Sequence, residues 1–186
     1  RFLLPPPHEV LTNSLLDKAH VNPMLEALWV TAKVSLVGFV FAALIGVAVG
    51  VLMSRGSLME RAIYPWAVVL QVIPVLAIVP LIGLWFGYGM VARTIVCVII
   101  AIFPIISNTT VGLRSVDQGH QNLFAVNRAS RLQKLIYLRI PSALPFFFAG
   151  LRVSSGLALI GAVVAEFVEV PSESDAERHP AVGDVV

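Results

Sequence analysis

Four long apolar stretches constrain the fold of this chain more than any other feature of its sequence. They run from Leu28 to Met53, from Ile63 to Phe86, from Val91 to Leu113 and from Leu144 to Val168. Each reaches the roughly 20 residues that a helix needs to cross the hydrocarbon core of a bilayer. We therefore predict an all-α polytopic membrane protein with four transmembrane helices.

The composition argues against a soluble domain. Of the 186 residues, 58% are apolar and 13% are charged, and the mean hydropathy is +0.87. Soluble domains have about 25% charged residues, so too few charges remain here to cover a surface in water. The single cysteine, Cys97, lies inside an apolar run and can form no disulfide within the chain.

The predicted spans divide the chain into three regions. Residues 1–27 are expected to form a segment on the periplasmic side, with a short amphipathic piece around Val10 to Ala19. Residues 28–168 form the membrane core, which includes a long loop over residues 114–141. Residues 169–186 are polar and acidic, and we expect this tail to be disordered.

The positions of the cations predict which loops face the cytoplasm, because short cytoplasmic loops are enriched in Lys and Arg. Seven of the 13 cations lie in the first and third loops, namely Arg55, Arg61, Arg114, Arg128, Arg131, Lys134 and Arg139. The second loop has no cation before Arg93. Both charged loops are therefore assigned to the cytoplasm, and both ends of the chain to the opposite side.

Small residues recur every four positions in the first and fourth spans. The stripes are Gly38, Ala42, Gly46 and Gly50 in one span, and Ser154, Ala158 and Ala162 in the other. Small side chains at this spacing let helix backbones approach closely inside lipid, so we expect both stripes to pack against neighbouring helices. Three prolines predict kinks in the second and third spans: Pro74, Pro80 and Pro104.

The chain lacks the residue patterns of an enzyme or an ion-coupled pump. No phosphate-binding loop is present, and all four histidines lie outside the predicted spans. Glu166 is the only carboxylate in a predicted span, and it lies near the outer end, whereas transporters bury ionisable groups near the midplane. We expect no metal, cofactor, nucleic-acid partner or catalytic activity, and any uphill transport would draw its energy from another subunit.

A basic stretch, RASRLQKLIYLRIPSALP at residues 128–145, stands directly before the fourth span. On a helical wheel, one face holds Ala125, Ala129, Leu132 and Ile136, and another holds Arg128, Arg131 and Lys134. We predict one basic amphipathic helix that stops at Pro141 and restarts as the span. Such a helix can lie against anionic headgroups or dock on a partner protein.

Four segments of the chain match a known family, and they occur in the order that the family has. They are IYPWAVVLQVIPVLAIVPLIGLWFGYG, FPIISNTTVGLRSVD, LPFFFAGLRV and LALIGAVVAEF. From about Leu3 to Val168 the chain resembles the inner-membrane permease subunits of binding-protein-dependent ABC importers. The resemblance is to the branch that handles nitrate, taurine, aliphatic sulfonates and vitamin precursors.

The third loop is similar to the cytoplasmic motif of that family, which has Glu-Ala-Ala, then a Gly, and a closing Ile-x-Leu-Pro. In an alignment on Pro141, the two apolar places hold Leu138 and Ile140, and Ala129-Ser130 matches the pair that follows the Gly. The Gly place itself holds Arg128, and the Glu-Ala-Ala place holds Asn122, Leu123 and Phe124.

The resemblance implies that this loop is a coupling helix, which docks on a separate ATP-binding cassette ATPase subunit. The implied docking residues are Leu123, Phe124, Ala125, Arg128, Ala129, Ser130, Arg131, Leu132, Ile136 and Pro141. The other implied partners are a periplasmic or lipoprotein solute-binding protein, a second permease copy and the bilayer of the bacterial inner membrane. The implied solute is a small anion or organic molecule, such as a sulfonate, taurine, nitrate or a vitamin precursor.

Five polar residues are candidates for the solute path: Gln71, Asn108, Ser154, Ser155 and Glu166. Gln71 and Asn108 lead, because each lies three or four residues from a helix-breaking proline. Most polar side chains inside membranes instead bond to neighbouring helices, so both roles stay open.

The two ends of the chain depart from the resemblance. Family members generally have one helix before the position of Leu3 and another after the AEF segment, and we expect this chain to lack both. EVPSESDAERHPAVGDVV favours a truncated or frameshifted end over a genuine variant tail. The alternatives to an importer subunit are a non-functional permease fragment, a secondary transporter or channel, and a membrane-embedded enzyme.

Overall fold

The computed structural model describes residues 18–167, which are helical and contain no strand. The elements are α2 (Lys18–Ser54), α3 (Ser57–Val72), α4 (Val75–Phe86), α5 (Met90–Arg114), α6 (Gln118–Val126), α7 (Arg131–Lys134), the π-helical turn η2 (Leu135–Arg139) and α8 (Ile140–Phe167). Most of the predicted amphipathic piece at Val10 to Ala19, and the predicted tail at residues 169–186, lie outside the described residues. The three predicted regions and the absence of two family helices therefore stay predictions.

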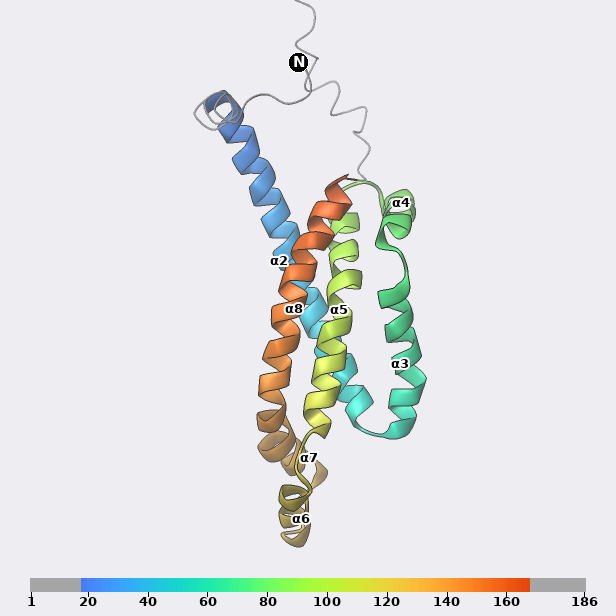
Figure 1. Cartoon of the computed structure of the whole chain (residues 1–186), viewed down its shortest axis with the longest axis vertical. Helices are drawn as coiled ribbons and strands as arrows, with labels where there is room; N and C mark the ends of the chain where they lie inside the picture. The colour runs from blue at the N-terminus through green and yellow to red at the C-terminus, as the bar shows by residue number, and fades with distance from the viewer. Residues whose placement is uncertain (1–17, 168–186) are drawn as a thin grey trace, which may run out of the picture.

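Three long helices, α2, α5 and α8, lie side by side and form the body of the molecule (Figure 1). The central helix is α5, which packs against both of the others and against α3 and α4. Val34 of α2, Cys97 of α5 and Ala162 of α8 are all buried where the three helices meet. The all-α fold is therefore confirmed for the described residues, with its core along α5.

The two small-residue stripes lie in the contacts with α5, as the sequence predicts. Gly38, Ala42, Gly46 and Gly50 are all buried on α2, and Ser154, Ala158 and Ala162 are buried on α8. A β-carbon added at Gly50 would lie 2.7 Å from Cβ of Thr109, and one at Gly161, which lies beside the α8 stripe, would lie 3.0 Å from the Cα of Cys97. These backbone approaches are possible only because the stripes carry small side chains.

The second predicted span consists of two helices. α3 and α4 meet at an angle of 97° around Pro74, which is the N-cap residue of α4. The residue before a proline is forced out of the helical region, and Ile73 accordingly has an extended backbone with ψ at 128°. Among the described residues, three helices are long and apolar enough to cross a membrane, and this bent pair is the possible fourth span.

Both charged loops lie at the same end of the molecule. The turn between α2 and α3 lies at the end from which α6 and α7 extend, whereas α4 meets α5 at the opposite end (Figure 1). Arg114 at the end of α5 joins the two loops, because it pairs with Glu60 of α3 and donates to the carbonyl of Met53 at 2.9 Å. The first and third loops therefore lie on the same side, as the distribution of cations predicts.

Candidate functional site

The predicted coupling segment is not a single helix but two short helices joined by a tight turn, which we call the hairpin. α6 ends at Val126, residues 127–130 form a turn, and α7 begins at Arg131. The predicted face of Ala125, Ala129, Leu132 and Ile136 is therefore wrong, because these residues lie on different elements. The helical wheel assumed an unbroken helix, and the turn changes the direction of the chain in the middle of the set.

The turn has the hydrogen bonds of a Schellman motif. The amide of Ala129 donates to the carbonyl of Phe124, and the amide of Arg128 donates to that of Ala125, both at 3.0 Å. This motif places the residue after the C-cap in the left-handed region, where glycine is usual. Arg128 occupies this place with φ at 49° and, among the described residues, is the only non-glycine with a positive φ. Its position in the Gly place of the resembled motif was the sequence signal for the break.

α7 has its own start signal directly after the turn. The hydroxyl of Ser130 accepts a hydrogen bond from the amide of Gln133 at 3.2 Å, and the Gln133 side chain accepts one from the Ser130 amide at 2.8 Å. This reciprocal capping box satisfies two amides that the helix itself leaves free. The Ser130–Gln133 capping box fixes the start of α7 at Arg131. Arg128 and Ala129 therefore stay outside the helix, in the turn.

Pro141 does not end the helix, so that prediction is also wrong. Residues Arg131–Phe167 form one continuous helical path through α7, η2 and α8. In a regular α-helix the ring of Pro141 would clash with the carbonyl four residues before it. The wider π turn at Leu135–Arg139 precedes the proline, and the amide of Ile140 donates to the carbonyl of Leu135. The wider turn provides the space that the ring needs.

The hairpin presents on one side a groove that is mainly apolar, with Asn127 and Gln133 as its polar residues. The groove has a volume of about 310 Å³ and is lined by Leu123, Phe124, Asn127, Ala129, Gln133 and Tyr137. Apolar side chains remain exposed around it, with Leu123 at 62% and Tyr137 at 70% of their full exposure. Three of the predicted docking residues, Leu123, Phe124 and Ala129, thus come together.

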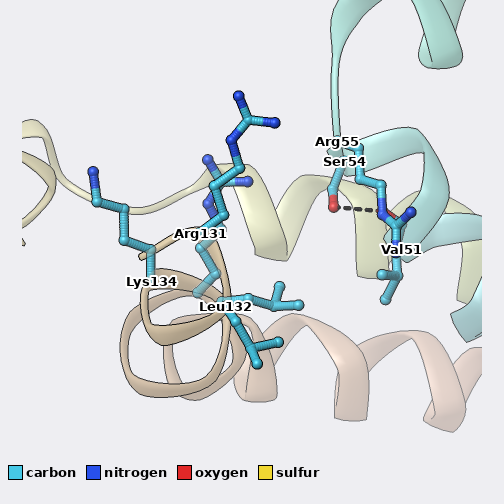
Figure 2. Close-up of a pocket in the computed structure, with 8 residues that line it drawn as sticks. Val51, Ser54, Arg55, Arg131, Leu132 and Lys134 are labelled. Atoms are coloured by element: carbon cyan, nitrogen blue, oxygen red, sulfur yellow. Dashed lines mark hydrogen bonds between the residues drawn. The ribbon is translucent and has the colours of Figure 1, made fainter. Parts of the chain in front are cut away.

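The other side of the hairpin lines a second, basic cavity (Figure 2). Its volume is about 670 Å³, and its walls are Val51, Ser54, Arg55, Arg131, Leu132, Lys134, Leu135 and Arg139. The predicted docking residues Arg131 and Leu132 belong to this cavity and not to the apolar groove. The hairpin therefore has two chemically different sides.

The candidates for the solute path lie on three helices and have different surroundings. Ser154 is fully buried, and its hydroxyl donates to the carbonyl of Ala101 at 2.6 Å, which joins α8 to α5. The amide of Asn108 donates to the carbonyl of Pro104 at 2.8 Å. Ser155 is exposed and donates to the carbonyl of Arg152 at 2.9 Å, and Gln71 is exposed near the end of α3. Contact of any of them with a solute stays a prediction.

Glu166 takes part in a polar contact between three helices. Its carboxylate accepts hydrogen bonds from the hydroxyl of Thr31 on α2 at 2.8 and 2.9 Å. It also forms an ion pair with Arg93 of α5, with 3.4 Å between Nη1 and Oε1. Sequence reasoning missed Thr31 and the pairing, although the opposite charges of Arg93 and Glu166 near the outer ends of consecutive spans were a usable signal.

Comparison with known proteins identifies the family. Residues 38–170 match the model of the binding-protein-dependent transport system inner membrane component. The chain belongs to this family. The predicted resemblance and the predicted multi-pass location in the bacterial inner membrane are thereby confirmed, and the family members are transport components rather than enzymes.

Several curated relatives are permease proteins with different named solutes. The chain is 35% identical over 168 residues to the formylaminopyrimidine transport permease protein ThiX of Halalkalibacterium halodurans, covering 90% of this chain and 66% of ThiX. It is 42% identical over 110 residues to the riboflavin permease protein RibX of Chloroflexus aurantiacus, covering 59% and 41%. It is 36% identical over 132 residues to the nitrate import permease protein NrtB of Leptolyngbya laminosa, covering 71% and 47%. The chain thus spans between less than half and about two thirds of the length of these relatives.

Proposed function

We propose that this family member is the transmembrane subunit of an ATP-driven importer and couples the solute path to a separate ATPase subunit. The observation that carries the proposal is the α6–α7 hairpin, which extends beyond the end of the helix bundle (Figure 1) and exposes an apolar groove there. Exposed apolar side chains outside a bilayer are typical of a surface that a partner protein covers.

The connection between the hairpin and the spans supports a mechanical role. α7, η2 and α8 are continuous, and α8 packs along α5 and α2 through its small residues. A displacement of the groove by a partner therefore acts on α8 without an intervening flexible loop. Interfaces of this kind move as rigid bodies because packed helices do not deform continuously.

The solute is proposed only as a class. The relatives are named for formylaminopyrimidine, riboflavin and nitrate, which are small organic or anionic solutes. We propose a solute of this kind, delivered by an external solute-binding protein, and a path completed by a second permease copy. Sulfonates and taurine remain in the proposed class.

Docking in the groove is tested by Ala129→Glu. The change would add bulk and a charge to a wall of the groove, where a partner would leave the carboxylate desolvated. We expect membrane insertion to be retained and the ATPase to be lost on co-purification in detergent, together with transport in vesicles. Retention of the ATPase by the Ala129→Glu protein would overturn the proposal.

Gln118→Glu is the matched control for this experiment. It introduces the same charge into the same hairpin, but at the first residue of α6 and outside the lining of the groove. A carboxylate in the first turn of a helix is favourable, so the hairpin should keep its structure. ATPase binding should stay within about twofold of the unmodified protein.

A further inference from the structure

The basic cavity beside α7 is lined by cations from two segments that are far apart in the sequence. Arg55 directly follows α2, and Arg131 and Lys134 belong to α7 (Figure 2). Arg139 belongs to η2 and completes the set. The first and third loops thus supply one common site.

The charge of this cavity is not balanced by the protein. No carboxylate lines it among the described residues, and none of its four cations forms an ion pair with a described carboxylate. The carboxylate in the first turn of α3, Glu60, pairs with Arg114 instead. Cations that line one cavity without an acidic partner attract anions. The unbalanced positive charge of the cavity therefore favours the binding of a negatively charged ligand.

Apart from Ser54, the remaining walls of the cavity are apolar, and they lie near the end of α2 and the start of the helical path that leads into α8. Val51 belongs to the apolar part of α2, and Leu132 and Leu135 lie on the helical path that leads into α8. A soluble anion would gain nothing from these side chains. A ligand with a phosphate group on an apolar body would contact both kinds of wall, and the planar guanidinium groups of Arg55, Arg131 and Arg139 suit phosphate oxygens.

We propose that this cavity binds the phosphate of an anionic phospholipid from the cytoplasmic leaflet. Basic pockets between helices on this side of a membrane bind such headgroups. The proposal is independent of the docking groove, because Gln133 and Tyr137 line the groove whereas Arg131 and Lys134 line the cavity. One side of the hairpin meets the partner protein, and the other side meets lipid.

The test measures lipid binding to the purified chain in detergent by native mass spectrometry. We expect phosphatidylglycerol to bind, and phosphatidylcholine and inorganic phosphate each to bind at least tenfold more weakly. The variant Arg131→Gln/Arg139→Gln should weaken phosphatidylglycerol binding about thirtyfold, because each cation near an anionic membrane surface contributes about five- to sixfold. Equal binding of inorganic phosphate would assign the site to a soluble anion and overturn the proposal.

Arg61→Gln/Arg152→Gln is the matched control. It removes the same charge from exposed positions that do not line the cavity, and the affinity for phosphatidylglycerol should change less than twofold. An equal loss in both double variants would show unspecific electrostatic attraction and overturn the proposal. A third outcome would also overturn the proposal: the ATPase displaces the lipid, and its own binding requires Arg131 and Arg139. The two arginines would then belong to the interface with the ATPase.

A second measurement keeps the proposal testable if the cavity variant fails to fold. Photoreactive phosphatidylglycerol should label the unmodified chain on peptides that contain Val51 or Leu135, and excess phosphatidylglycerol should suppress this labelling. Labelling that is confined to the lipid-facing helices elsewhere would contradict the proposal.

Discussion

Gly46 of α2 lies so close to Ile105 of α5 that a β-carbon added to the glycine would be 2.9 Å from Cγ2 of the isoleucine. Real β-carbons do not approach so closely, so the two helices can keep this separation only while residue 46 has no side chain. The same argument applies along the stripe, at Gly50 against Thr109. The close packing of α2 on α5 therefore requires the small residues of this stripe.

Gly46→Leu should therefore separate α2 from α5 while membrane insertion is retained, because leucine is favourable in lipid. We expect a loss of about 1–3 kcal/mol in the free energy of unfolding, measured by thermal denaturation in detergent. Gly156→Leu is the control, since nothing lies within 4 Å of a β-carbon at Gly156. Equal effects of the two substitutions would contradict close packing at Gly46.

Arg128→Gly should stabilise the hairpin. A non-glycine residue in the left-handed region costs about 1–2 kcal/mol, and Arg128 has φ at 49°. Hydrogen exchange of the α6 amides should become slower by about fivefold or more. Arg61→Gly inside α3 should have the opposite effect on α3 amides, because glycine in a helix costs about 1 kcal/mol. Faster exchange in α6 of the Arg128→Gly protein would show that the turn does not strain residue 128.

Glu166→Gln tests whether the carboxylate connects helices or contacts the solute. Removing the charge weakens the bonds to Thr31 and Arg93, and we expect a loss of stability of about 1 kcal/mol, typical of polar contacts between helices in membranes. Thr31→Val should cost a similar amount, and the double variant should cost less than the sum. Unchanged stability together with altered solute selectivity would support the path role instead.

The topology predicted from the cations is tested with reporter fusions. A reporter after Arg131 should report the cytoplasm, and one after Gly87 should report the outside, because these residues lie at opposite ends of the bundle. The reverse pattern would contradict the docking of a cytoplasmic ATPase and the binding of a cytoplasmic lipid.

The sequence by itself determined the features that the bilayer imposes on every residue. Apolar length predicted the long helices, the cation count predicted that the first and third loops share one end, and the spacing of Gly38 to Gly50 predicted a buried face. These patterns are local or periodic along the chain. They can be interpreted without the tertiary structure, because the bilayer requires apolar helices across it and favours cations in cytoplasmic loops.

Only the tertiary structure decided the features that depend on contacts between distant segments. The sequence predicted a kink at Pro74, but the 97° size of the bend, the passage of the helix through Pro141 and the pairing of Thr31 with Glu166 came only from the structure. A helical wheel could not show that Ala129 and Arg131 lie on opposite sides of the hairpin, because one residue with a positive φ, Arg128, redirects the chain between α6 and α7. The division of the hairpin into an apolar groove and a basic cavity follows from that single turn.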